Sequence, residues 1–459
     1  MLLKADAAFL PLKDESVQCI VTSPPYWSLR KYEGMQERVW PPPSVPPPGG
    51  GRQVGGCAHE WGDEIPGDLR GGSGPDAKEC YGGGDGKTNY ARQVPRGNFC
   101  LRCGAWRGAL GLEPTPELYL EHLMVCLREM RRVLRKDGTL FLNLGDNRTK
   151  DRQWQGLPQR ILFAAIQDGW RWEDEIVWFK INAMPESQEN RTTRAHDYIY
   201  VLNKSRKAFW DADAVREPFS ESTEKRIAQA TFWQQGGGEK DYRGGTNANR
   251  SARRALENLA RKQDGHGRRH AGFNDRFDGS PPGNAGANLR SVWEIPTQPF
   301  PEAHFATFPE ELPRRSILLS TSPYACGKCG APWRRETKRI GGPPRGTHLQ
   351  HAHVRRNPQG RPGGDARPYG SDLSEIYAKY GFPKIETLGF SPTCRCEPPP
   401  SVPPPGGGRQ VGGAGRCIVL DPFVGSGTTV KVAAALGRHG VGVDLAYQEM
   451  ARERAGLFS

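Results

Sequence analysis

The segment that decides the fold of this chain is Cys417-Ile418-Val419-Leu420-Asp421-Pro422-Phe423-Val424-Gly425-Ser426-Gly427-Thr428-Thr429. Its apolar start predicts a buried strand, its glycines allow a tight turn, and a helix is expected over 428–437. The next predicted strand, Val441–Asp444, ends in an acid about 17 residues after Gly427. A glycine-rich turn alone would fit any strand-to-helix connection. Together with this acid it is typical of a site for a nucleoside-containing cofactor.

Two further blocks of the chain, residues 1–30 and 114–203, have a periodic apolar pattern. The first contains a predicted buried strand, Val17–Val21. The second predicts, in order, helix Glu117–Arg135, strand Thr139–Leu144, helix Pro158–Asp168, strand Glu175–Phe179 and strand Tyr198–Leu202. Asp137-Gly138 is expected to stop the first helix, and a last helix to close the chain. Strands that alternate with helices predict an α/β fold with a mostly parallel sheet.

Composition narrows the class of protein. The chain has 459 residues, of which 36% are hydrophobic, with 57 glycines and 40 prolines, so polar segments dilute the core. No run approaches the roughly 20 apolar residues of a membrane span, and the first residues do not resemble a signal peptide. We therefore expect a cytoplasmic protein that is neither secreted nor membrane-bound. The net charge of +13 favours an anionic partner, and nucleic acid is the foremost candidate.

A second chemical motif, Thr22-Ser23-Pro24-Pro25-Tyr26-Trp27, follows the strand Val17–Val21. The two prolines fix the backbone, so that the Ser23 hydroxyl and the Pro24 carbonyl are acceptors in set directions. Tyr26 adds an aromatic face. Acceptors beside a stacking ring suit a planar group that bears an amino group, whereas the alternative interpretation is a rigid turn with buried aromatic residues.

Together the two motifs resemble the amino-methylating DNA methyltransferases, whose catalytic motif has the form [DNS]-P-P-[YFW] and whose cofactor loop has the form F-x-G-x-G. The order of the motifs resembles the permuted beta arrangement of that family. The resemblance implies a Rossmann-like fold with circularly permuted motif order, S-adenosylmethionine as cofactor and double-stranded DNA as substrate. It implies catalytic roles for Ser23, Pro24, Pro25 and Tyr26. It implies cofactor contacts for Asp6, His304, Phe305, Thr307, Asp421, Phe423, Gly425, Gly427, Thr428 and Asp444.

The chemistry expected from the resemblance is methyl transfer to an exocyclic amine of a base flipped out of the duplex. Ser23 and the Pro24 carbonyl would accept the two N–H bonds and leave the nitrogen lone pair available, while Tyr26 would stack on the base. Serine in the first position of the motif resembles the N4-cytosine members, and N6 of adenine is the alternative. An RNA or protein methyltransferase and a non-catalytic DNA-binding zinc protein on the same fold are the rivals. A bacterial or phage source and a partner restriction endonuclease would fit the family.

The 11 cysteines are an odd number, which favours metal ligation or free thiols over disulfides. Two C-x2-C knuckles, Cys100/Cys103 and Cys326/Cys329, predict structural zinc sites. Cys57 and His59 would complete the first site, for which Cys80 is a competing ligand, and Cys394 and Cys396 would complete the second. Four protein ligands leave no open position, so neither site is expected to be catalytic. Cys19, Cys126 and Cys417 lie in apolar patterns and are expected in the core.

The domain organisation follows from these blocks. Residues 1–40 and 110–203 are assigned to the catalytic part of a methyltransferase domain, and 291–324 and 416–459 to its cofactor-binding part. Insertions separate them: a linker with a first zinc-ribbon-like module over 41–109, a basic target-recognition segment over 204–290, a second zinc-ribbon-like module over 325–397 and a linker over 398–415. The 16 residues PPPSVPPPGGGRQVGG occur identically at 41–56 and 398–413 and indicate a twice-inserted linker.

Overall fold

The computed structural model describes residues 1–27, 37–41, 57–66, 96–148, 153–183, 185, 190–217, 288–298, 308–340, 384–396 and 414–445. The chain divides into two compact units. The first comprises Met1–Ala214, Arg290–Arg334 and Phe390–Ser459, and the second comprises Val215–Leu289 and Arg335–Gly389. Among the described residues, no helix is both long and apolar enough to cross a membrane.

The first unit is built on a mixed sheet in the order β1-β15-β14-β2-β6-β8-β7-β9. Its strands are β1 (Leu2–Lys4), β2 (Val17–Thr22), β6 (Leu134–Leu144), β7 (Arg171–Phe179), β8 (His196–Asn203), β9 (Val292–Glu294), β14 (Ile418–Asp421) and β15 (His439–Asp444). Neighbours pair in parallel except where β8 meets β6 and β7. The predicted α/β class with a mostly parallel sheet is therefore confirmed.

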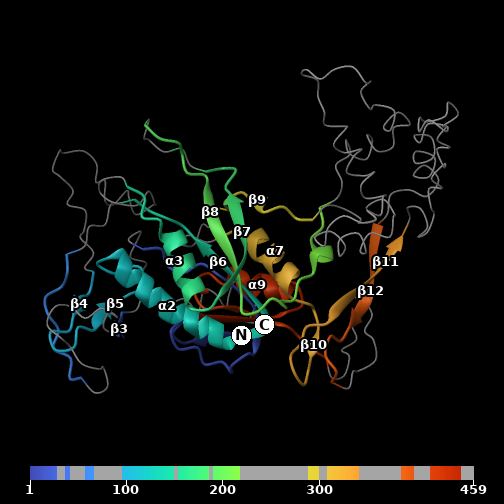
Figure 1. The fold of residues 1–459 in the computed structure, drawn as a ribbon, viewed down its shortest axis with the longest axis horizontal. Coiled ribbons are helices and arrows are strands. Elements are labelled where there is room, and N and C mark those ends of the chain that lie inside the picture. Colours follow the sequence, from blue (N-terminus) through green and yellow to red (C-terminus); the bar gives the residue numbers. More distant parts are fainter. Residues whose placement is uncertain are drawn as a thin grey trace, which may run out of the picture. The chain divides into compact units, whose positions relative to one another are not determined.

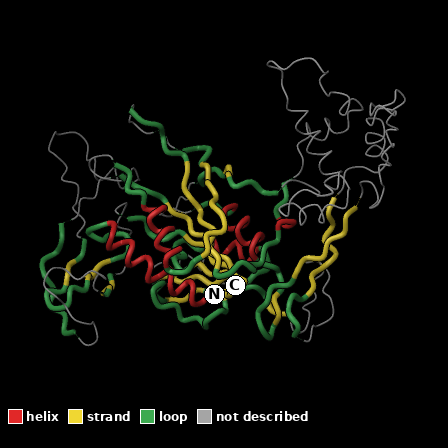
Figure 2. Tube along the Cα trace, in the orientation of Figure 1, coloured by secondary structure: helices red, strands yellow, loops and turns green. Residues whose placement is uncertain are grey.

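Helices lie on both faces of this sheet (Figure 1). α2 (Pro116–Val133) and α3 (Leu157–Gln167) pack together, as do α7 (Glu311–Ser320) and α9 (Thr428–Ala435). Alternation along the strands explains the two layers. Ile20 belongs to the core under α2 and α3, whereas its neighbour Cys19 hydrogen-bonds Ser320 of α7. Figure 2 shows the strands side by side between the two helix pairs.

The described residues also form shorter elements outside the large sheet. β3 (Arg38–Trp40), β4 (Asn98–Phe99) and β5 (Trp106–Gly108) form an antiparallel sheet in the order β3-β5-β4. β10 (Ala325–Cys326) pairs with β13 (Ala414–Gly415), and β11 (Arg334–Ile340) with β12 (Lys384–Ser391). A 3₁₀ turn, η1, spans Ala212–Ala214.

The end of the first predicted helix needs a correction. Thr115 caps α2 by accepting from the Leu118 N–H, but the helix ends at Val133 rather than at Asp137-Gly138. The reason is that buried Leu134 already pairs with Val17 of β2. A β-carbon at Gly138 would lie 2.8 Å from the Gln18 carbonyl oxygen, so this glycine serves a close approach of strands instead of a helix stop.

Other sequence predictions agree with the fold, or fall outside what can be described. The predicted core positions of Cys19, Cys126 and Cys417 are confirmed, since each of these side chains is at most 1% exposed. The last helix, nearly all of the duplicated linker and most of the basic 204–290 segment lie outside the described residues. The assignment of domains therefore stays a prediction.

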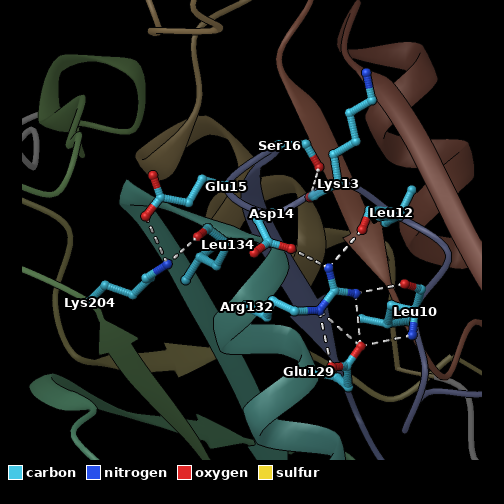
Figure 3. A network of polar contacts seen from close by, with 10 residues as sticks. All are labelled: Leu10, Leu12, Lys13, Asp14, Glu15, Ser16, Glu129, Arg132, Leu134 and Lys204. Carbon is cyan, nitrogen blue, oxygen red and sulfur yellow. Dashed lines mark hydrogen bonds and ion pairs between the residues drawn. The ribbon is translucent and has the colours of Figure 1, made fainter.

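The loop between β1 and β2 is fixed to α2 by Arg132 (Figure 3). Its guanidinium donates to the carbonyls of Leu10 and Leu12 at 2.8 and 2.9 Å, and to Asp14. Glu129 accepts from Arg132 and from the Leu10 N–H. The hydrogen bond from Arg132 lowers the pKa of Glu129. Arg132 thus fixes the chain that leads directly into the central strand β2.

Replacing Arg132 should destabilise the fold. Arg132→Ala removes two main-chain hydrogen bonds and the ion pairs with Glu129 and Asp14, so we expect the free energy of unfolding to fall by about 1–3 kcal/mol. Arg128→Ala is the matched control, because Arg128 lies on the same helix, is 59% exposed and forms a surface ion pair with Asp168. That change should cost less than about 1 kcal/mol. Equal effects of the two variants in chemical denaturation would contradict the assignment.

Candidate active site and metal clusters

The two chemical motifs meet at one edge of the sheet. β2 and β14 are parallel neighbours, with Leu420 opposite Ile20, so their carboxyl ends lie side by side. Ser23–Tyr26 follows β2 and the glycine-rich turn follows β14, although about 400 residues separate the two motifs in sequence. Ligands of open α/β sheets bind outside the carboxyl ends of strands. The structure thus brings the predicted catalytic and cofactor segments together.

Asp421 joins the two motifs through buried hydrogen bonds. Its Oδ1 accepts from the Thr22 hydroxyl at 2.7 Å and its Oδ2 accepts from the Thr429 hydroxyl at 2.7 Å. The Phe423 N–H also donates to Oδ1. Burial raises the pKa of Asp421 to about 6, although the hydrogen bonds from both threonines oppose this shift. Asp421 therefore acts as a joint between the end of β2, the turn and α9.

The glycine-rich turn is held by the acid at the end of the next strand. The Gly425 N–H donates to Oδ2 of Asp444 at 3.1 Å. Gly425 and Gly427 have positive φ angles of 45° and 81°, which favour glycine, and Gly427 caps α9. A β-carbon at Gly425 would meet nothing within 4 Å, so the turn leaves open space there. Thr428 is buried and its hydroxyl contacts Ser426.

The catalytic motif is arranged around the Tyr26 hydroxyl. Ser23 donates to this oxygen at 3.4 Å, and Asn143 of β6 donates its amide N–H at 3.1 Å. Asn143 also approaches the Ser23 hydroxyl, at 3.5 Å. A β-carbon at Gly145 would lie 2.4 Å from the Tyr26 ring, so only glycine leaves room for the ring there. The segment Asn143–Gly145 therefore shapes the environment of the motif.

The other predicted cofactor residues are less informative. Asp6 accepts from the Ala8 N–H and forms an ion pair with Arg38, whose guanidinium stacks on Trp40. Its contact with a cofactor stays a prediction. His304, Phe305 and Thr307 lie outside the described residues.

The first cysteine cluster comes together as predicted. The ligand atoms of Cys57, His59, Cys100 and Cys103 lie within 4.8 Å of one another. Burial acts to raise the pKa of Cys100, but hydrogen bonds from the Cys103 backbone and from His59 outweigh it and lower the pKa to about 6. A thiolate is the form that binds metal, and this donor set fits zinc.

The second cluster is attached to the sheet. Cys326, Cys329, Cys394 and Cys396 also have ligand atoms within 4.8 Å of one another. The backbone N–H of Cys329 is the main cause that lowers the pKa of Cys326 to about 7. Arg135 donates to the Cys329 carbonyl at 2.5 Å, and Gln18 donates to the Gly330 carbonyl at 2.7 Å. Gln18 also accepts from the Ile418 N–H at 2.6 Å.

Several of these residues were not singled out from the sequence. Thr22 and Thr429 adjoin the motifs, but only the pairing of β2 with β14 shows that they share Asp421. Gln18 looks like a polar position within a strand, and nothing in its spacing indicates a link to Gly330. Asn143 is the exception, because the sequence block Asn143-Leu144-Gly145-Asp146 resembles one found in methyltransferases whose catalytic motif is Ser-Pro-Pro-Tyr.

Comparison with known proteins identifies the class. A family model described as DNA methylase, covering the N6 and N4 enzymes, matches residues 17–327 and 416–452. The chain therefore belongs to the N6/N4 DNA methylase family of S-adenosylmethionine-dependent DNA methyltransferases. Its mostly parallel α/β sheet agrees with the fold that the sequence resemblance implies.

Individual relatives agree with this family. The type II methyltransferase M.Cfr9I of Citrobacter freundii is 27% identical over 340 residues, which cover 68% of this chain and 69% of the relative. M.SmaI of Serratia marcescens is 27% identical over 244 residues, covering 47% and 63% of the two chains.

Two solved structures are similar over 99% of this chain. The PvuII cytosine-N4-specific DNA methyltransferase aligns over 85% of its own chain with a TM-score of 0.42 and 11% identity. A Thermus thermophilus DNA modification methylase in complex with S-adenosyl-L-methionine aligns over 93% of its chain with a TM-score of 0.37 and 14% identity.

The raised pKa of the buried Asp421 carboxyl predicts a pH-dependent contribution to stability, which tests its role in connecting β2, the turn and α9. Because its pKa is raised from 3.8 to about 6, the folded state holds a proton that the unfolded state releases between these values. This contribution to stability is present at low pH and is lost as the pH rises through about 6, with a slope of up to about 1.4 kcal/mol per pH unit.

Asp421→Asn cannot titrate, so the stability of this variant relative to the parent should increase from pH 4 to 7 and then become constant. Urea unfolding of both proteins across this range measures the difference. A difference independent of pH would show that Asp421 titrates normally in the folded state.

Proposed function

We propose that this chain methylates the exocyclic N4 of cytosine at specific sites in double-stranded DNA, after the base is flipped out of the duplex. The single observation that carries the proposal is the buried link between Thr22 and Asp421, because it holds the Ser23–Tyr26 motif beside the glycine-rich turn. In-line displacement requires the methyl donor and the acceptor nitrogen to be held next to each other, and the two segments that would bind them are adjacent here.

The residues of the turn fit S-adenosylmethionine. Gly425 leaves space for a close approach, and the N-terminus of α9, capped by Gly427, follows directly. Asp444 has one oxygen on the Gly425 N–H, and we assign it to the ribose hydroxyls by its place at the end of β15. When bound, the cofactor supplies an electrophilic methyl group on a sulfonium.

The catalytic motif would act on the amine through acceptors. The Ser23 hydroxyl directs its proton to Tyr26 Oη, so its oxygen is available to accept an N–H of the base. Pro24 adds a carbonyl in a fixed direction, and Pro25 is held by Tyr119, which donates to its carbonyl at 2.8 Å. Among the described residues the buried Asn143 Oδ1 has no hydrogen-bond partner, and it is a further acceptor beside these hydroxyls. Acceptors fixed in advance stabilise the charge that develops on nitrogen.

The choice of cytosine over adenine rests on serine in the first position of the motif. N6 of adenine is the alternative, because both amines need the same two acceptors. A non-catalytic DNA-binding protein on this fold is the rival from another class. The hydrogen-bonded arrangement of Ser23, Tyr26 and Asn143 favours an enzyme over that rival.

The decisive experiment is incubation of mixed-sequence duplex DNA with the protein and S-adenosylmethionine, followed by nucleoside mass spectrometry. We expect N4-methylcytosine in duplex DNA and none in RNA. Ser23→Ala should lower the single-turnover rate by about a hundredfold or more while cofactor binding is retained. Asp444→Ala should instead weaken cofactor binding.

Each result has a different meaning. N6-methyladenine would select the alternative base. Binding of S-adenosylmethionine and DNA without transfer would favour the non-catalytic rival. A Ser23→Ala variant with the parental rate would contradict the acceptor mechanism.

We further propose that each cysteine cluster holds one structural zinc ion, since each presents four ligands and thiolates suit zinc. Elemental analysis of the purified protein should find two zinc ions per chain. Cys103→Ser and Cys329→Ser should each remove one of them. Cys126→Ala, a core cysteine outside both clusters, should keep both. Zinc that is absent from the parent, or retained in full by both serine variants, would contradict the proposal.

A further inference from the structure

The first cysteine cluster belongs to a small module that has little core of its own. The module comprises β3, the segment 57–66 and the segment 96–108, which carries β4, the Cys100/Cys103 pair and β5, and its strands are only two or three residues long. Hydrogen bonds join the parts, from the Gly62 N–H to the Phe99 carbonyl and from the Arg96 N–H to the Ile65 carbonyl. Its own cluster of buried residues is limited to Cys100, Cys103 and Ala105. So small a structure depends on a crosslink such as a metal ion.

This module contacts the residue that follows the catalytic motif. Arg96 donates to the Glu113 carbonyl at 2.8 Å, and the Trp27 indole N–H donates to the same oxygen at 2.9 Å. The Arg96 guanidinium also lies over the Trp27 ring, 5.5 Å from its centre. Trp106 of β5 in turn donates to the Arg96 carbonyl at 2.9 Å. Arg96 therefore connects the module to Trp27.

A second set of contacts runs through the buried side of the module. The His122 ring stacks on Trp40 of β3 and on Trp106 of β5, with ring centres 4.4 and 5.3 Å away. Its Nδ1 lies 3.1 Å from Oε1 of Glu113, which is fully buried. The other Glu113 oxygen accepts from the Gly111 N–H at 2.8 Å.

Gly111 completes the connection to the catalytic motif. A β-carbon at this position would lie 3.1 Å from the Tyr26 carbonyl oxygen and 3.2 Å from the Pro25 ring. The segment that leaves β5 is therefore packed directly against the backbone of the motif. Hydrogen bonds of the glycine-rich turn, by contrast, join it to Thr22 of β2, to Val443 and Asp444 of β15 and to its own helix.

We propose that the Cys57/His59/Cys100/Cys103 metal site positions the catalytic motif through Arg96 and Glu113, so that loss of the metal slows methyl transfer without weakening cofactor binding. This inference rests on the proposed function for its activity readout. Arg96 and Glu113 are positioning residues, because they contact Trp27 and not the reacting atoms. The metal stabilises the module, and the module fixes Trp27, which directly follows the Ser23–Tyr26 motif.

The test compares two arginines of the same module in the full-length protein. Arg96→Ala removes the bridge to Trp27, whereas Arg102→Ala removes an exposed ion pair with Glu60, in which both side chains are more than half exposed. We expect Arg96→Ala to retain two zinc ions and to bind S-adenosylmethionine within about twofold of the parent. Its single-turnover rate should fall about tenfold or more, which is about 1.4 kcal/mol in the barrier. Arg102→Ala should match the parent in all three measurements.

Hydrogen exchange supplies a readout that does not depend on activity. Peptides that contain residues 22–27 should exchange faster in Arg96→Ala and in Cys103→Ser than in Arg102→Ala. Trp27→Phe keeps a six-membered aromatic ring but loses the indole N–H donor and part of the ring area, so it should reproduce part of the rate loss. If Cys103→Ser does not fold, the Arg96 and Arg102 variants decide the question alone.

The inference is overturned if Arg96→Ala is indistinguishable from Arg102→Ala in transfer rate and in exchange. It is also overturned if Cys103→Ser loses its metal but keeps the parental rate and exchange. A parent protein without methyl transfer would defeat the proposed function instead, and the exchange comparison would still test the positioning of the motif.

Discussion

The structure depends on one buried carboxylate that serves both halves of the site. Asp421 accepts from Thr22, the last residue of β2, and from Thr429 in the first turn of α9. Its desolvation is unfavourable, which is why its pKa is raised, and the two hydroxyls and the Phe423 N–H offset part of this penalty. A buried acceptor set of this kind tolerates little displacement, because each lost partner leaves a polar atom unsatisfied. The distance between the catalytic motif and the cofactor turn is therefore set by hydrogen bonds rather than by apolar packing alone.

The parallel sheet allows the two motifs to occur in this order along the chain. In parallel strands, all carboxyl ends lie at one edge, so a segment contributes to the site wherever its strand occurs in the sequence. β2 comes early and β14 and β15 come late, yet Ser23, Asp421 and Asp444 gather at that edge. Segments inserted between these strands leave the strand ends in place, so they are compatible with the site of the methylase family to which the chain belongs.

The sequence was sufficient where local chemistry determines structure, and insufficient where distant polar groups meet. Apolar periodicity located the strands Val17–Thr22 and His439–Asp444 to within a residue or two, and C-x2-C spacing located both cysteine clusters. It failed at Asp137-Gly138, because a strand that pairs with Val17 takes precedence over a local turn signal. It also could not reveal the roles of Gln18, Arg96 and Glu113, since their contacts with Gly330, Ile418 and Trp27 are far away in sequence and polar residues carry no periodic signal. Long-range hydrogen bonds are therefore what the structure adds to the sequence.

The two cysteine clusters support the central strand from opposite ends. The second cluster is tied through Gln18 to the amino ends of β2 and β14, because Gln18 bridges the Gly330 carbonyl and the Ile418 N–H. The module of the first cluster contacts Trp27, beyond the carboxyl end of β2. A strand fixed at its start and at the loop that follows it has little freedom to slide against its neighbour. Since that neighbour carries the glycine-rich turn, the contacts made by both cysteine-cluster segments limit the same displacement that the Thr22–Asp421 hydrogen bond limits from within.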